Sequence, residues 1–132
     1  MAQQARRITP MHIVDDVDAA GRAFEALGFE RMDADLPDEC RGWRAANGSS
    51  VVVAPRSLLR HQFGEKVVAR IDQTVVPYVW VESVSVALEE LFERAEPGNI
   101  PDVLGQVLTE HHTVEALVSF RGSLMLIAER LG

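Results

Sequence analysis

The sequence predicts an α+β fold built from two copies of one βαβββ module, and two internal repeats carry this prediction. Residues 10–20 and 77–87 share prolines, valines and an alanine at a common offset of 67 positions. Residues 48–54 and 122–128 each begin with Gly-Ser and continue into an apolar run, at an offset of 74 positions. Because a half of roughly 65 residues would bury only a marginal core alone, we expect a single domain, 1–132, in which the two modules pack together.

The first module is expected over residues 8–55. It opens with a strand at 8–14, after which Asp16 or Asp18 caps a helix that runs to about Leu27, before Gly28. The remaining elements are strands at residues 29–35, 41–46 and 50–54, with Asn47-Gly48 as the turn between the last two.

A connector over residues 56–74 precedes the second module, which we expect over residues 75–130. The connector is rich in apolar residues and is therefore expected to hold a short helix or strand rather than a free linker. In the second module, Ser83 or Ser85 begins a helix that ends near Ala95. Its strands are expected at residues 75–81, 103–109, 114–120 and 124–128, with Arg121-Gly122 at the last hairpin.

The composition excludes several classes of function. The formal net charge is −7 and the sequence pI is about 5.0, which disfavours nucleic acid and anionic membrane surfaces as partners. Cys40 is the single cysteine, so no internal disulfide is possible, and a cytoplasmic location fits. The first residues lack the apolar run of a signal peptide, and no stretch has the length of a membrane span.

The repeated pattern resembles the vicinal oxygen chelate superfamily, which includes glyoxalases, extradiol dioxygenases and bleomycin-resistance proteins. The resemblance is carried by the paired modules, and especially by residues 14–20 together with Leu27-Gly28-Phe29. It implies that each module forms a curved mixed sheet and that the two modules surround a cup. Two-fold dimers are common in this superfamily, so we also expect a homodimer.

The same resemblance argues against the usual metal chemistry of the superfamily. The positions that carry metal ligands in its enzymes correspond here to Thr9, Val52, Val76 and Leu126. Valine and leucine cannot coordinate a metal, and a lone threonine is a poor ligand. We therefore expect no metal and no other cofactor.

An apolar cup with aromatic anchors is the expected binding site. The expected ligand-binding residues are Met11, Trp43, Tyr78, Trp80 and Leu126, which suit a flat or aromatic molecule. The alternative is that these side chains simply fill a collapsed core. In the family register, the lining of the cup comprises Thr9, Met11, Ile13, Val52, Ala54, Val76, Tyr78, Trp80, Leu124, Leu126 and Ala128.

Polar groups offer a second interpretation. His12 is expected to face the helix, because strand side chains alternate and Thr9 faces the cup. Glu110 and His112 could share a face of a strand, with Glu115 joining them only if the strand kinks, and one of these groups could then act in acid-base chemistry.

Three functions remain open from the sequence. The first is a metal-independent protein of the bleomycin-resistance type that sequesters a small apolar or aromatic molecule. The second is a superfamily enzyme, such as a lyase, isomerase or dioxygenase, that uses a displaced metal or a catalytic pair formed by His112 with Glu110 or Glu115. The third is a degenerate scaffold with an assembly or regulatory role. Resemblance in fold cannot choose among them.

Overall fold

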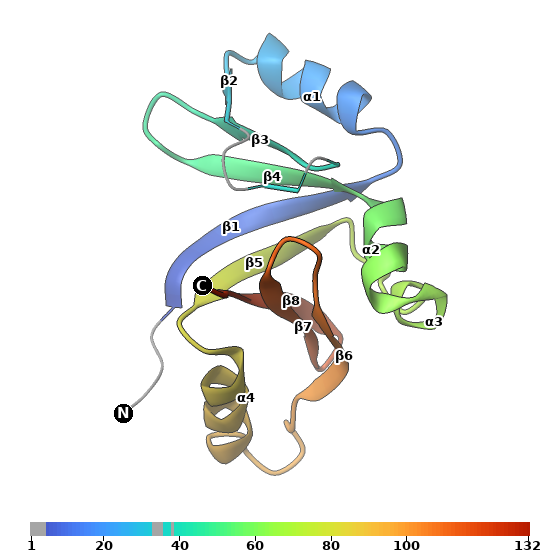
Figure 1. Ribbon diagram of the computed structural model, residues 1–132, viewed down its shortest axis with the longest axis vertical. Helices are drawn as coiled ribbons and strands as arrows, with labels where there is room; N and C mark the ends of the chain where they lie inside the picture. Colours follow the sequence, from blue (N-terminus) through green and yellow to red (C-terminus); the bar gives the residue numbers. More distant parts are fainter. Residues whose placement is uncertain (1–4, 33–35, 38) are drawn as a thin grey trace. The chain divides into compact units, whose positions relative to one another are not determined.

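A computed structural model describes residues 5–32, 36–37 and 39–132 of the chain (Figure 1). The chain divides into two compact units. The first unit is Thr9–Val76, and the second unit combines Met1–Ile8 with Pro77–Gly132. The boundaries fall within two strands, β1 (Ala5–Val14) and β5 (Val75–Val81), so each strand contributes residues to both units.

The first unit contains a four-stranded sheet in the order β2-β3-β4-β1. Strand β1 runs parallel to β4, and the other two pairs are antiparallel. The expected strand at 29–35 is observed only as the short β2, and residues 33–35 of that prediction lie outside the described residues. The elements that follow β1 in this unit are α1 (Val17–Ala26), β2 (Glu30–Arg31), β3 (Arg41–Arg44), β4 (Ser50–Pro55), α2 (Arg56–Phe63) and α3 (Glu65–Val68).

Helix α1 begins and ends at local signals in the sequence. The carboxylate of Asp16 accepts a 3.0 Å hydrogen bond from the backbone N–H of Ala19, as an N-cap residue does. Gly28 follows the helix at φ 89°, a left-handed conformation that glycine adopts without strain. The helix then covers one face of the sheet, where Phe24 and other apolar residues pack around Trp43.

The connector folds into helices α2 and α3. Each helix buries one apolar side chain, Leu59 in α2 and Val68 in α3, and Ile71 just beyond them is also buried. The apolar residues of the connector therefore belong to a packed segment, as the sequence predicts.

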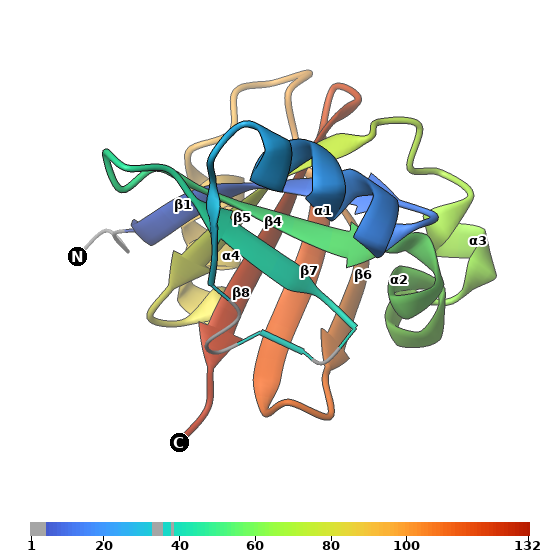
Figure 2. The ribbon, with the colours of Figure 1, turned by 90° about the horizontal axis from the view of Figure 1, so that it is seen from above.

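The strands of the second unit are hydrogen-bonded in the order β5-β8-β7-β6 (Figure 2). Strands β5 and β8 are parallel, and the other two pairs are antiparallel. Arg121 and Gly122 both have positive φ, at 52° and 88°, which matches the right-handed twist of a tight hairpin between β7 and β8. The elements that follow β5 are α4 (Val84–Glu93), β6 (Asp102–Leu108), β7 (Thr113–Phe120) and β8 (Ser123–Arg130).

Helix α4 packs on one face of this second sheet and forms the core of the unit. Its buried residues, Val84 and Ala87, contact apolar residues that alternate along the strands. The strand residues of this core are Val79, Val81, Ala116, Val118 and Ile127. In the described part of the chain, no helix has the length and apolar character needed to cross a membrane.

Candidate functional site

Strand alternation places three of the expected ligand-binding residues on one face of the second unit's sheet. Tyr78 and Leu126 are register partners on β5 and β8, and Trp80 pairs with Ala128 two residues further along. The residues between them point to the opposite face, where α4 packs. We call the face opposite α4 the Glu115 face; it comprises Tyr78, Trp80, Thr113, Glu115, Leu117, Leu124, Leu126 and Ala128.

Glu115 is a buried carboxylate on an otherwise largely apolar strand. It is 5% exposed, which is rare for an ionisable residue. Two hydroxyls donate to its Oε2 atom: that of Tyr78 at 3.0 Å and that of Thr113 at 2.9 Å. Ala128, the register partner of Glu115 on β8, is small and fully buried, which leaves room for Tyr78 and Glu115 to meet above β8.

The polar network continues into the turn between β6 and β7. The Thr113 hydroxyl lies 2.6 Å from the Thr109 hydroxyl. Because Thr113 uses its one proton on Glu115, Thr109 is the donor of this second bond. The Thr109 oxygen in turn accepts from the backbone N–H of His111 at 3.3 Å. A chain of hydrogen bonds therefore runs from the turn to the buried carboxylate.

Burial raises the pKa of Glu115 above the ordinary value of a glutamate. The hydrogen bonds from Thr113 and Tyr78 act in the opposite direction, as does the nearby charge of His111, and they offset only part of the effect of burial. Glu115 is thus a group that could hold a proton at a pH where an exposed glutamate would be ionised. Such shifted groups are common in functional sites, although structural networks also produce them.

Trp80 lies beside this network and is only partly buried. Its ring stacks on Tyr78 with 5.1 Å between centroids and 26° between planes. The guanidinium carbons of Arg7 and Arg130 lie 5.6 and 5.5 Å from the Trp80 ring centroid. This arrangement combines a flat aromatic surface with two positive charges.

The residues on the Glu115 face do not fit the metal centre that the fold family implies. Of the expected ligand positions, Leu126 lies on this face and Val76 is the last residue of the first unit; both are buried hydrocarbon side chains. Glu115 is surrounded by hydroxyls rather than by further ligating groups. Among the residues that the structure describes, no group of three His, Cys, Asp or Glu side chains is placed to hold a metal ion.

Trp43 does not lie where the sequence-based interpretation placed it. It packs beneath α1, stacks on Phe24 at 5.6 Å, and donates from Nε1 to Glu25 at 3.3 Å. At 2% exposure it is a core residue beneath α1, whereas the sequence predicts it as a ligand anchor.

A shift of one residue in a hairpin explains why Trp43 lies on the α1 face of the sheet. A two-residue turn at Asn47-Gly48 would place Trp43 opposite Val52. The observed turn holds three residues, because Ala45 donates to the backbone oxygen of Ser49, and Trp43 therefore pairs with Val51. A shift of one position sends a strand side chain to the other face of the sheet.

Met11 and His12 occupy opposite faces of β1 in the first unit. The His12 ring packs edge-on against Phe24 of α1 at 5.6 Å, as alternation predicts. Met11 is buried on the face turned away from α1, opposite Val52 in the register of the sheet. The expected anchors are thus divided: Tyr78, Trp80 and Leu126 share one face of the second unit, and Met11 belongs to the first.

The second interpretation required Glu110 and His112 to lie on a strand. In the structure they do not. Both are exposed in the turn between β6 and β7, where His112 adopts φ 59°. Of the neighbouring turn residues, His111 is the one whose charge acts on Glu115. Glu115 reaches its face by regular alternation along β7 and needs no kink, because the pairing of β7 with β8 is continuous.

Sequence reasoning missed the hydroxyls of Thr109 and Thr113 and the guanidiniums of Arg7 and Arg130. One signal was available: Glu115 interrupts a strand of apolar residues at a position whose neighbours two residues away, Thr113 and Leu117, face inward. A carboxylate at such a position needs donors on the adjacent strands. The arginines carried no signal, because their nearness to Trp80 depends on the pairing of strands.

Comparison with known proteins gives the fold and no closer relationship. No protein-family model matches the chain, and no curated protein matches it either. Among solved structures, the chain is similar to a glyoxalase/bleomycin resistance protein/dioxygenase superfamily member from Vibrio splendidus 12B01, with 15% identity over 97% of this chain and 100% of that chain, and a TM-score of 0.56.

Two further structures are similar at lower scores. A glyoxalase/bleomycin resistance protein/dioxygenase family enzyme from Burkholderia phytofirmans PsJN has 14% identity, with 92% of this chain and 95% of that chain covered and a TM-score of 0.36. A hypothetical protein from S. aureus has 13% identity, 90% and 89% coverage, and a TM-score of 0.35. The similarity to the Vibrio structure shows a fold of the glyoxalase/bleomycin-resistance/dioxygenase type, as the sequence predicts.

Proposed function

We propose that this chain is a metal-independent binding protein that holds a small, flat, largely apolar or aromatic molecule against the Glu115 face. The observation that carries the proposal is the Tyr78–Trp80 stack, which presents a partly buried indole next to two arginine side chains. Aromatic side chains bind flat ligands with little loss of conformational entropy.

The charges around Trp80 narrow the class of ligand. Arg7 and Arg130 both approach the indole, so an anionic group on the ligand would be favourable there. Leu124 and Leu126 are buried hydrocarbon side chains on the same face, so the surroundings of the indole are apolar. An aromatic carboxylate, such as a substituted benzoate, combines these features.

Metal independence rests on the residues themselves. Leu126 stands at the family's ligand position on this face, and the one carboxylate there is held by the hydroxyls of Tyr78 and Thr113. The superfamily named for the Vibrio structure includes bleomycin resistance proteins, so a binding role without chemistry is compatible with this fold.

Two single-tryptophan variants test the proposal, because the chain has only Trp43 and Trp80. Trp43→Phe leaves Trp80 as the reporter, and Trp80→Phe leaves the buried Trp43. Titration with a panel of substituted benzoates should change the emission of the first variant in a saturable way and leave the second nearly unchanged. Calorimetry on the unaltered protein gives the affinity independently.

Three results would contradict the proposal. They are equal emission changes in both variants, no saturable response to any member of the panel, and binding to Trp80→Ala as tight as to the unaltered protein. Matched benzamides, which lack the negative charge, should bind more weakly than the benzoates. If both series bind equally, the role given to Arg7 and Arg130 is wrong.

A second candidate function is proton transfer by Glu115, favoured by its burial and its raised pKa. Such an enzyme would use Glu115 as an acid or base toward a ligand on the same face. Hydrogen exchange in D₂O measures this directly, with 1-phenyl-2-propanone as an aromatic probe that carries acidic C–H bonds. Exchange catalysed by the protein and lost in Glu115→Gln supports it, and equal rates in the two proteins contradict it.

A further inference from the structure

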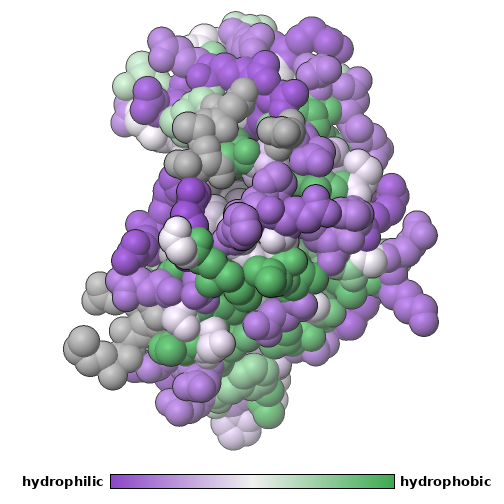
Figure 3. Space-filling model, viewed as in Figure 1, coloured by the Kyte–Doolittle hydropathy of each residue, from purple (hydrophilic) through white to green (hydrophobic). Residues whose placement is uncertain are grey.

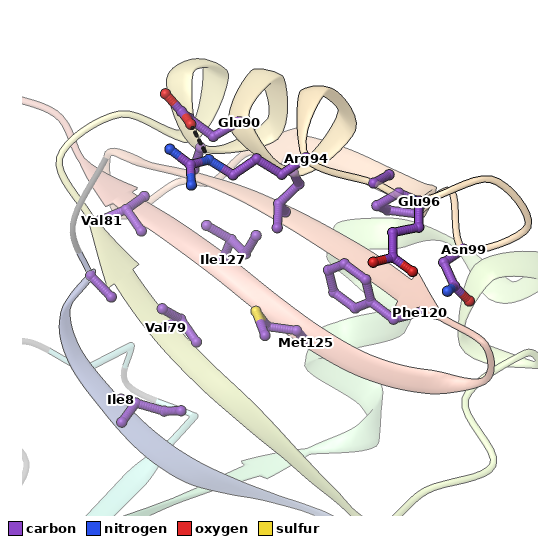
Figure 4. A pocket seen from close by; sticks show the side chains of 15 residues that line it. Ile8, Val79, Val81, Glu90, Arg94, Glu96, Asn99, Phe120, Met125 and Ile127 are labelled. Atoms are coloured by element: carbon purple, nitrogen blue, oxygen red, sulfur yellow. Dashed lines mark hydrogen bonds and ion pairs between the residues drawn. The ribbon is translucent and has the colours of Figure 1, made fainter. Parts of the chain in front are cut away.

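A groove lies on the other face of the same sheet, between helix α4 and the strands (Figure 4). Its volume is about 860 Å³, within the range of small-molecule sites. All of its lining residues belong to the second unit. Alternation along β5 and β8 separates it from the Glu115 face, so Val79 and Ile127 line this groove while Tyr78 and Leu126 face away from it.

The floor and walls of the groove are apolar. Val79, Val81, Met125 and Ile127 rise from the strands toward α4, and Phe120 lies at the end of the groove that also holds Glu96 and Asn99 (Figure 4). Ile8, near the start of β1, borders the groove and is 66% exposed, which is unusual for an isoleucine on a strand. Hydrophobic residues also gather over the strands of this unit in the space-filling view (Figure 3). The groove thus offers a surface for a hydrocarbon chain.

The polar groups of the groove are mostly acceptors. The carboxylate of Glu90 accepts from Nε of Arg94 at 2.9 Å, so the one positive charge in the lining is already paired. At the other end, Glu96 and Asn99 lie side by side beyond the end of α4 (Figure 4). The lining therefore carries two negative charges, Glu90 and Glu96, and one positive charge, Arg94.

Asn99 adds an acceptor that is buried and unused. Its backbone N–H donates to the backbone oxygen of Glu96 at 2.9 Å, which fixes the turn. Its side-chain oxygen is buried and has no hydrogen-bond partner among the described residues. Buried polar atoms without partners are uncommon in folded proteins, so this oxygen calls for a donor from a bound molecule.

We propose that the groove binds a single-chain amphiphile with a primary ammonium head group. The hydrocarbon chain lies on the apolar floor, and the ammonium group donates to Asn99 Oδ1 and Glu96 at the end where Phe120 lies. An ammonium group suits this end because it has three donors and no acceptor. A fatty acid anion fits poorly, since its carboxylate would meet Glu96 and an acceptor oxygen. The site is independent of the proposed binding function of the Glu115 face.

Binding is tested on the full chain with three probes of equal chain length: decylamine, decanol and decanoate, each below its micelle concentration. Calorimetry should show decylamine binding tightest and decanoate weakest. In ¹H–¹³C spectra, decylamine should shift the Met125 methyl signal, which reports on the groove. Decanoate binding as tightly as decylamine would overturn the proposal.

Matched variants separate the groove from the general attraction of an acidic protein for cations. Glu96→Gln should weaken decylamine about two- to fivefold, while Glu93→Gln, an exposed change on α4 outside the lining, should have no effect. Asn99→Leu should weaken it at least about tenfold and leave decanoate unchanged. Equal effects of the two glutamate variants would overturn the proposal. So would a concentration-dependent dimer that excludes decylamine, because the occupant would then be a second copy of the chain.

Discussion

The hydroxyl of Tyr78 on β5 donates a 3.0 Å hydrogen bond to the carboxylate of Glu115 on β7, and this bond spans the strand between them, β8. The bond is possible because β8 presents Ala128 at the crossing point. Three neighbouring strands are therefore tied together by a polar contact on a face that is otherwise largely apolar. Both the stability of the unit and the protonation of Glu115 depend on it.

Tyr78→Phe should destabilise the protein by about 1.5–3 kcal/mol, the range for a hydrogen bond to a charged group. It should also raise the pKa of Glu115 further, because the Tyr78 hydroxyl lowers that pKa in the intact protein. Urea denaturation gives the first quantity, and NMR titration of the Glu115 carboxyl carbon gives the second. In a Glu115→Gln background the same substitution should cost much less, and equal costs in the two backgrounds would contradict the coupling.

Glu115→Gln should change how stability depends on pH. Folding raises the pKa of Glu115, so the folded protein binds this proton more tightly than the unfolded chain does. The stability from this group is full below the ordinary pKa of glutamate and is lost as pH rises through the raised value. The variant should therefore gain stability relative to the unaltered protein as pH rises from the ordinary pKa of glutamate through the raised value.

The measurement for Glu115→Gln is the free energy of unfolding across that pH range. Glu93→Gln serves as the control, because Glu93 is exposed on α4. A difference between Glu115→Gln and the unaltered protein that stays constant with pH would show that Glu115 ionises normally in the folded state.

Local signals in the sequence were enough to predict the modules and the ends of their helices. Asp16, Gly28 and Ser83 act on neighbouring backbone groups, so their effect can be read without knowing the tertiary structure. The inward position of Tyr78, Trp80 and Leu126 also followed, because strand alternation is local.

The site could be predicted only in part, because its remaining features depend on pairing between strands. Trp43 lies on the α1 face of the sheet because the hairpin turn after β3 has three residues rather than two. The bond from Tyr78 to Glu115 joins residues 37 positions apart and requires the order β5-β8-β7. The placement of Arg7 beside Trp80 likewise depends on which strand lies next to the start of β1.

Gly21→Ala should destabilise the first unit although alanine favours helices. Gly21 is buried in α1, and an added Cβ atom would lie 2.7 Å from Cη2 of Trp43 and closer still to Cζ2. The gain in helix propensity is about 1 kcal/mol. Overpacking a core costs about 1–3 kcal/mol, and contact this close belongs at the upper end.

The glycine prediction is checked by urea denaturation with and without Trp43→Phe. The smaller ring removes the clashing atoms, so Gly21→Ala should then be much less costly, or stabilising. If the substitution costs the same in both backgrounds, contact with Trp43 is not the reason that glycine occupies this position.

The start of α4 is held by a strand as well as by its own cap, and Glu129→Ala should therefore cost more than Ser83→Ala. The Glu129 carboxylate on β8 accepts from the backbone N–H of Val84 at 2.9 Å, whereas the Ser83 hydroxyl accepts from Val86 at a longer 3.3 Å. Val84 is fully buried, so removing Glu129 leaves its N–H without this partner and takes a negative charge from the positive end of the helix.

We expect losses of about 1–2 kcal/mol for Glu129→Ala and about 0.5 kcal/mol for Ser83→Ala, measured by chemical denaturation. Glu129→Gln keeps an acceptor and should recover much of the loss; a larger loss for Ser83→Ala than for Glu129→Ala would show that the local cap dominates.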